Sequence, residues 1–136
     1  MKPKQVIKVR DVMKTKVDMI DGKMTVKDAL EQMAHVETKT LMVNKRSQDD
    51  EYGIVLLSDI AKQVLAKDRS AERVNIYEIM TKPIISIDPD MDIRYCARLF
   101  ERFGLTRAPV IENRAIIGMV SFTDMVLKGL SAQKDD

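Results

Sequence analysis

The sequence predicts an α+β fold made of two β-α-β-β-α units. Two observations lead to this prediction. The chain is repeated, because Met13 and Met80 lie 67 residues apart and Asp21 and Asp88 share that spacing. Each repeat also runs from a short apolar strand to a helix, a β-hairpin and a second helix. One repeat is about half of the 136 residues and buries too little apolar surface to be stable alone. We therefore expect the repeats to share a core about a pseudo-two-fold axis.

The elements follow one another in the same order in both repeats. Thr25 and Asp92 each stand where a helix starts, and either side chain can cap a helix N-terminus. Cys96 falls on the apolar face of its helix and is predicted to be buried. The predicted strands are 17–20, 41–44, 52–56, 84–87, 109–112 and 116–120, and the closing helices are 58 to about 66 and 122 to about 130.

The repeats divide the chain into four segments. We predict the first repeat at 6–66, a polar connector with some helix at 67–75, the second repeat at 76–130 and a polar tail at 131–136. The spacing falls from 67 to 65 between Val43 and Gly53 and their counterparts, so the first repeat is two residues longer there. The extra residues lie in the polar stretch 45–51, which predicts a longer hairpin loop.

The composition excludes several classes of function. Lys and Arg total 23 against 21 Asp and Glu, which argues against a nucleic-acid-binding protein. The single cysteine rules out a disulfide within the chain, and no apolar run approaches the roughly 18 residues of a membrane span. We expect a cytoplasmic protein that contacts no membrane. The sequence holds no P-loop, dinucleotide fingerprint, metal cluster or nucleophile with its base, so we expect no enzyme, no catalytic residue and no metal ligand.

Short motifs recur at the start and end of each repeat. Val9–Met13 and Ile76–Met80 open the repeats, and Gly53–Asp59 and Gly118–Asp124 close their hairpins. The closing motif reads Gly, two apolar residues, Ser or Thr, two variable residues and Asp. Together with the Arg-Ala-Pro-Val strand at 107–110, these motifs resemble the CBS domain over roughly residues 6 to 130. Two such repeats resemble a stand-alone Bateman module.

The resemblance implies a regulatory module that binds an adenosyl ligand in clefts between the repeats. It implies that Asp124 holds the ribose hydroxyls and that Ser121 and Arg107 contact phosphate, which suits a carboxylate, a hydroxyl at a helix start and a guanidinium. The remaining positions that it implies are Pro109 on the same strand as Arg107, with Ile84 and Ile85 beside the adenine.

The first repeat departs from this pattern. Asp59 is retained, but Leu56 replaces the hydroxyl residue and Thr40 stands where the second repeat has Arg107. The ligand-binding residues predicted here are Asp59 and Thr40. We expect the site of Asp124 to be the principal one and the site of Asp59 to be weaker or empty.

Two alternatives stay open. Ser121 and Asp124 also fit a helix capping box, in which the pair stabilises the helix start. Capping and ligand contact can coexist in these two residues. The second alternative is that the chain is a structural dimerisation module with degenerate ligand clefts. The resemblance also implies a homodimer and a regulated partner protein, whose identity the sequence does not give. Nor does the sequence choose among AMP, ADP, ATP, NAD(H) and S-adenosylmethionine as the regulatory ligand, and it predicts no catalytic cofactor.

Overall fold

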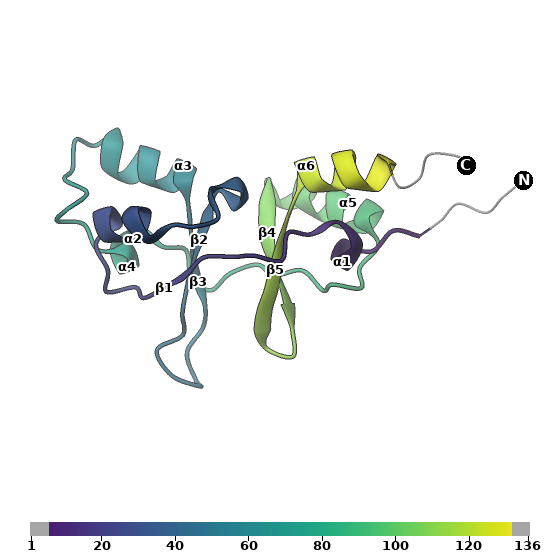
Figure 1. Cartoon of the computed structure of the whole chain (residues 1–136), viewed down its shortest axis with the longest axis horizontal. Coiled ribbons are helices and arrows are strands. Elements are labelled where there is room, and N and C mark those ends of the chain that lie inside the picture. The colour runs from purple at the N-terminus through teal and green to yellow at the C-terminus, as the bar shows by residue number, and fades with distance from the viewer. Residues whose placement is uncertain (1–5, 132–136) are drawn as a thin grey trace, which may run out of the picture. The chain divides into compact units, whose positions relative to one another are not determined.

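The computed structural model describes residues 6–131, which form two compact units (Figure 1). Unit 2 runs from Val17 to Ile84, and unit 1 combines the chain up to Lys16 with the chain from Ile85 onward. The units therefore cut across the sequence repeats. Residues 9–12 open the first repeat but pack in unit 1, with the elements of the second repeat. Residues 76–79 open the second repeat but pack in unit 2, with the elements of the first repeat.

Unit 2 is a three-stranded sheet with helices. The strand order is β1-β2-β3, with β1 parallel to β2 and β2 antiparallel to β3. A turn of 3₁₀ helix precedes β2, and a π-helical turn extends α3. In chain order the elements are β1 (Met19–Ile20), α2 (Val26–Gln32), the 3₁₀ turn (Val36–Thr38), β2 (Thr40–Val43), β3 (Gly53–Leu56), α3 (Leu57–Ile60), the π turn (Ala61–Leu65) and α4 (Ile76–Ile79).

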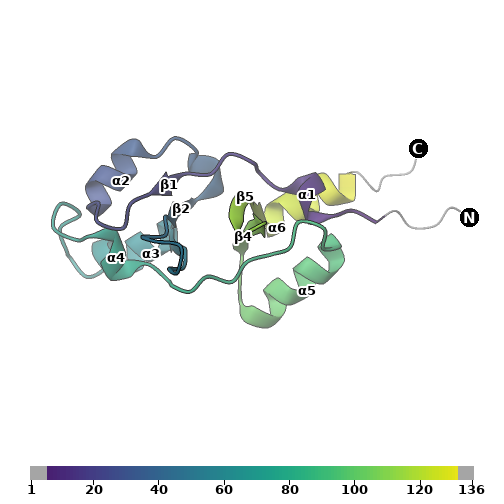
Figure 2. The same ribbon diagram turned by 90° about the horizontal axis from the view of Figure 1, so that it is seen from below.

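Unit 1 is built on one antiparallel hairpin. The two strands of the hairpin, β4 and β5, carry α6 at their end, and a π-helical turn continues α6. The short helix α1 lies beside the π turn that continues α6, although it comes from the other end of the chain (Figure 2). In chain order the elements are α1 (Val9–Val12), α5 (Ile93–Phe103), β4 (Arg107–Glu112), β5 (Ala115–Ser121), α6 (Phe122–Asp124) and the π turn (Met125–Leu130).

Each unit has its own apolar core, and each core takes residues from both repeats. Phe100 is fully buried in the core of unit 1, where its ring meets Phe122 edge to face at 5.3 Å between centroids. The buried apolar residues of unit 1 are Ile7, Val9, Val12, Ile87, Ile93, Cys96, Phe100, Ala108, Val110, Val120 and Met125. Those of unit 2 are Ile20, Val26, Ala29, Leu41, Val43, Val55, Val64, Val74 and Ile76.

Backbone hydrogen bonds hold the exchanged segments in place. In unit 1 the Val9 amide donates to the Met91 carbonyl at 2.9 Å. In unit 2 the Ile76 amide, 67 residues further on, donates to the Met24 carbonyl at 2.9 Å. A four-residue helix is unstable by itself, so α1 and α4 depend on these bonds and on the core beneath them.

The predicted helix caps and the buried cysteine are confirmed. Thr25 Oγ1 accepts a hydrogen bond from the Asp28 amide at 3.1 Å, and Asp92 Oδ1 accepts one from the Arg94 amide at 2.8 Å. Burial raises the pKa of the Cys96 thiol to about 11, so the thiol is protonated at neutral pH.

The strand predicted at 84–87 is wrong. Only Ile87 pairs with β4, through one bridge to Val110. The reason lies in Pro109. At the matching place in unit 2 the Met42 amide donates to the Asp18 carbonyl at 2.9 Å, but proline has no N–H to make this bond. In unit 2, β1 pairs with β2 over two residues, whereas in unit 1 the equivalent pairing is limited to Ile87 and Val110.

Other differences concern the connector and the ends of elements. The helix predicted within the connector 67–75 is wrong, because these residues form turns. The strand predicted at 17–20 is limited to Met19–Ile20, and the segments that open the repeats are helical. Both closing helices lie where predicted, but each changes to π-helical geometry after its first turn. Beyond Ser131, the predicted polar tail lies outside the described residues. No helix within residues 6–131 combines the length and the apolar character needed to cross a membrane.

We expect Gly118→Ala to destabilise the fold more than Gly53→Ala, its counterpart in the other unit. A Cβ atom at Gly118 would lie 2.6 Å from the Lys14 carbonyl oxygen, which a backbone bridge to Met119 holds in place. A Cβ at Gly53 would instead first meet the Met80 sulfur at 2.8 Å, and that side chain can move. Overpacking costs about 1–3 kcal/mol.

Urea unfolding of both variants measures the difference. Equal losses of stability in the two variants would show that the Lys14 backbone is not held as described.

Candidate functional site

Ser121 and Asp124 form a closed hydrogen-bonded pair at the start of α6. Ser121 Oγ accepts from the Asp124 amide at 3.1 Å, and Asp124 Oδ2 accepts from the Ser121 amide at 3.1 Å. The Ser121 hydroxyl also donates to Asp124 Oδ2 at 2.9 Å. The predicted capping box is therefore present, and one carboxylate oxygen is used within it.

Lys14 occupies the other carboxylate oxygen. Its ammonium group donates to Asp124 Oδ1 in an ion pair within unit 1. The side chain of Asp124 is only 4% exposed, while that of Lys14 is 26% exposed. A buried carboxylate without a partner is costly, so Lys14 serves as the counterion of Asp124 within unit 1.

Lys14 reaches Asp124 because the chain beside it is fixed to β5. The Lys14 amide donates to the Met119 carbonyl, and the Met119 amide donates back, both at 2.8 Å. Sequence reasoning missed this residue, since it belongs to the first repeat and Asp124 to the second. The spacing of 67 would have pointed to Thr81 as its counterpart, but not to an ion pair with Asp124.

The structure brings Arg107 to the same end of the hairpin. Arg107 stands opposite Ser121 in the β4–β5 register, and its side chain is partly buried. Pro109, two residues along, pairs with Met119 and is buried. The side chains of Asp124, Ser121 and Lys14 thus gather in unit 1 near the start of α6, with Arg107 on the adjoining strand.

The two isoleucines predicted beside the adenine fall in different units. Ile85 belongs to unit 1, as Asp124 does, and is 45% exposed. Ile84 is the last residue of unit 2 and is partly buried.

The equivalent place in unit 2 has different chemistry. Asp59 Oδ2 accepts from the Leu56 amide at 2.9 Å, so the backbone half of the capping pair is retained without a hydroxyl. Thr40 is fully buried opposite Leu56, and its hydroxyl donates to Thr38 Oγ1 at 3.3 Å. Thr81 takes the place of Lys14, bridging Ile54 as Lys14 bridges Met119. This end of unit 2 therefore has neither the serine nor the lysine of unit 1.

Neither site resembles a metal centre. Within the described residues, no three His, Cys, Asp or Glu side chains are grouped so as to hold a metal ion.

Comparison with known families fits this duplicated arrangement. The CBS domain family matches the chain twice, over residues 9–66 and 76–130. The chain belongs to the CBS domain family. It is a tandem CBS pair, and the matched ranges cover most of its length.

Relatives and solved structures agree with this assignment. The chain is 28% identical over 128 residues to the mitochondrial CBS domain-containing protein CBSX3 of Arabidopsis thaliana, covering 87% of this chain and 62% of that one. It is 34% identical to a hexameric CBS-CP12 protein from bloom-forming cyanobacteria, with a TM-score of 0.87, covering 96% of this chain and 76% of that one. The chain spans about three fifths of the length of the first curated relatives that it matches.

A second solved structure shares the fold at lower identity. The CBS domain pair of protein MJ0100, in complex with 5′-methylthioadenosine and S-adenosylmethionine, is 21% identical with a TM-score of 0.77. The alignment covers 96% of this chain and 100% of that one.

Replacing Lys14 tests its role as the counterion of Asp124. We expect Lys14→Met to destabilise the protein by about 3 kcal/mol, because it leaves a buried carboxylate unpaired. Lys16→Met is the matched control, since Lys16 is exposed and has no ion pair within the described residues. Chemical denaturation of both variants gives the two free energies of unfolding.

Asp124→Asn in the Lys14→Met background should restore part of the lost stability, because it removes the unpaired charge. Equal and small losses in Lys14→Met and Lys16→Met would contradict the ion pair.

Proposed function

We propose that this CBS pair is a regulatory module that binds an adenosyl ligand at the Asp124 site and alters the activity of a partner protein. The candidate ligands are AMP, ADP, ATP, NAD(H) and S-adenosylmethionine. The observation that carries the proposal is the grouping of Asp124, Ser121 and Lys14 in unit 1, with Arg107 on the adjoining strand. At the matching places in unit 2, Leu56 stands for Ser121, Thr81 for Lys14 and Thr40 for Arg107, so unit 2 has no charged residue at these three positions.

The chemistry of the grouping suits a nucleoside. A carboxylate accepts hydrogen bonds from both hydroxyls of a ribose. Asp124 Oδ2 is engaged by Ser121, so the diol would take the place of Lys14 at Oδ1. The released ammonium would then lie close enough to pair with a phosphate or carboxylate of the same ligand. Binding would replace the Lys14–Asp124 ion pair by a contact of Asp124 with the ribose and a contact of Lys14 with the anionic group of the ligand.

The known complex of a related fold supports an adenosyl ligand in particular. The MJ0100 pair was solved with two ligands that share the adenosyl group and differ in what is attached to the 5′ position. An adenosyl ligand is the common chemistry, while the 5′ substituent would be read by charged residues such as Lys14 and Arg107. A change in ligand occupancy can shift a partner's activity only through different affinities for two states of the module.

Titration calorimetry tests the ligand and the site together. We expect one of AMP, ADP, ATP, NAD, NADH and S-adenosylmethionine to bind, and Asp124→Asn to weaken that binding at least tenfold. Hydrogen bonds to a charged group contribute about 1.5–3 kcal/mol, which corresponds to such a factor. Asp59→Asn is the matched control and should change the affinity little.

Circular dichroism and thermal unfolding of the variants separate loss of binding from loss of folding. If Asp59→Asn abolished binding while Asp124→Asn did not, the assignment of the principal site would be overturned. No heat with any of the six ligands would favour the alternative, a structural dimerisation module in which Ser121 and Asp124 serve only as a helix cap.

We also propose that the module forms a homodimer through its helices. The closing helix of unit 1 exposes three large apolar side chains in a row of five residues, Val126, Leu127 and Leu130, with exposed fractions of 51%, 67% and 59%. On α5 of the same unit, Tyr95 and Phe103 are each 58% exposed. Apolar side chains grouped on helices in this way are typical of protein interfaces.

The mass in solution tests the dimer. We expect light scattering during size-exclusion chromatography to give twice the chain mass for the unmodified protein and the chain mass for Leu127→Glu. Gln48→Glu adds the same charge to an exposed loop residue and should remain dimeric. A monomeric unmodified protein, or a dimer unaffected by Leu127→Glu, would refute this interface.

A further inference from the structure

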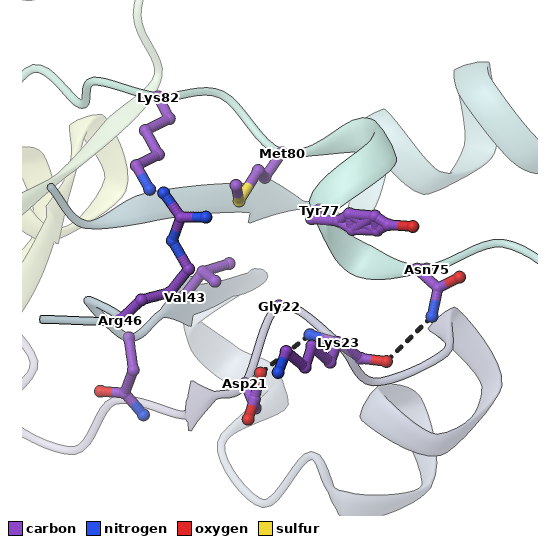
Figure 3. A pocket seen from close by; sticks show the side chains of 10 residues that line it. Asp21, Gly22, Lys23, Val43, Arg46, Asn75, Tyr77, Met80 and Lys82 are labelled. Atoms are coloured by element: carbon purple, nitrogen blue, oxygen red, sulfur yellow. Dashed lines mark hydrogen bonds between the residues drawn. The ribbon is translucent and has the colours of Figure 1, made fainter. Parts of the chain in front are cut away.

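A pocket of about 400 Å³ lies in unit 2 (Figure 3). It lies at the opposite end of the β2–β3 hairpin from Asp59. In the β2–β3 register, Thr40 pairs with Leu56 at one end and Val43 with Gly53 at the other. Asp59 follows the first end, whereas the pocket is lined by Val43 and by residues of the turn after β1 and of α4. The pocket is therefore separate from both aspartate sites described above.

An ion-paired side chain stands at the same place in unit 1. Arg10 stands 67 residues before Tyr77, a residue that lines the pocket. Arg10 Nε binds Asp90 Oδ1 at 2.8 Å, and its Nη2 binds Glu112 Oε2 at 2.6 Å. Unit 1 therefore has an ion-pair cluster of Arg10, Asp90 and Glu112 at the place where unit 2 has the pocket.

The charges are reversed between the two places. At the spacing of 67, Lys23 stands where unit 1 has Asp90, and Lys45 stands where it has Glu112. The Lys23 ammonium has no carboxylate partner within residues 6–131, and its backbone is fixed because its carbonyl accepts from Asn75 Nδ2 at 2.9 Å. The pocket has lost both acids of the unit 1 cluster and presents a cation in place of one of them.

Two further cations on the rim of the pocket, Arg46 and Lys82, form ion pairs with the Asp50 carboxylate. Asp50 Oδ2 accepts from Arg46 Nε at 3.1 Å, and Asp50 Oδ1 lies 2.6 Å from Lys82 Nζ. The Arg46 and Lys82 side chains hold the pKa of Asp50 well below its ordinary value. Arg46 and Asp50 lie in the hairpin loop that is longer in the first repeat, so this rim has no equivalent in unit 1.

The inner wall of the pocket is apolar and aromatic. Val43 and Met80 line it, and the Tyr77 side chain, 53% exposed, stands beside Met80 (Figure 3). A volume of this size falls in the range of small-molecule sites, about 300–1,000 Å³.

We propose that this pocket is a second ligand site, which binds a small organic phosphate with a planar or apolar body. The phosphate pairs with Lys23 and with the Arg46–Lys82 rim, where it competes with the Asp50 carboxylate. The body lies against Tyr77 and Met80. Because Asp50 belongs to the hairpin loop, occupation of the pocket releases that loop from Lys82. The proposal does not depend on the adenosyl site.

Nuclear magnetic resonance of the ¹⁵N-labelled full chain tests the pocket, with phenyl phosphate as the probe and inorganic phosphate and phenol as its two halves. We expect phenyl phosphate to shift the amide signals of Gly22, Lys23 and Tyr77 in a saturable way, and each half alone to bind at least tenfold more weakly. Lys23→Gln should weaken phenyl phosphate binding at least fivefold. Lys62→Gln, which removes an exposed charge in the same unit, should leave it unchanged.

A second variant introduces the unit 1 ion pair into the pocket instead of removing a charge. Lys23→Asp with Tyr77→Arg copies the Arg10–Asp90 pair of unit 1 into unit 2 and should abolish the shifts while keeping a folded spectrum. The proposal is overturned if Lys23→Gln and Lys62→Gln bind phenyl phosphate equally, or if the shifts avoid these three amides. It is also overturned if Asp124→Asn, outside the pocket, abolishes the same shifts.

Discussion

The exchange of the opening segments is the constraint on which the other features depend. Neither repeat has a complete core without residues from the other, because Val9 and Val12 are buried in unit 1 and Ile76 in unit 2. The exchange is fixed by backbone bonds of equal length at equivalent positions, from Val9 to Met91 and from Ile76 to Met24. The core of each unit thus depends on residues from both repeats.

The exchange also determines the chemistry of the two aspartate sites. The residue that follows each opening helix is delivered to the hairpin of the opposite repeat, where it bridges Met119 or Ile54. A lysine at this position neutralises Asp124, whereas a threonine stands at the equivalent position in the unit of Asp59. Two sites with the same backbone therefore differ in charge because of a residue far away in the sequence.

The repeats and the local hydrogen bonds could be predicted from the sequence, whereas contacts between distant residues could not. The caps at Thr25 and Asp92 and the capping pair of Ser121 and Asp124 depend on residues three or fewer positions apart, and all are present. The strand at 84–87 failed because its partner position is Pro109, which affects pairing only once the register is known. Lys14 was missed because no local pattern connects it with a residue 110 positions away.

The exchange of the opening helices also has a consequence for a protein with a single repeat. A single repeat carries its own opening helix, but in each unit that helix packs with the strands of the other repeat. A protein with only one repeat would complete its core by trading this helix with a second identical molecule. Because both repeats lie in one chain, equivalent positions in the two units need not carry the same residue, and Lys14, Arg10 and Tyr77 each stand in one unit alone.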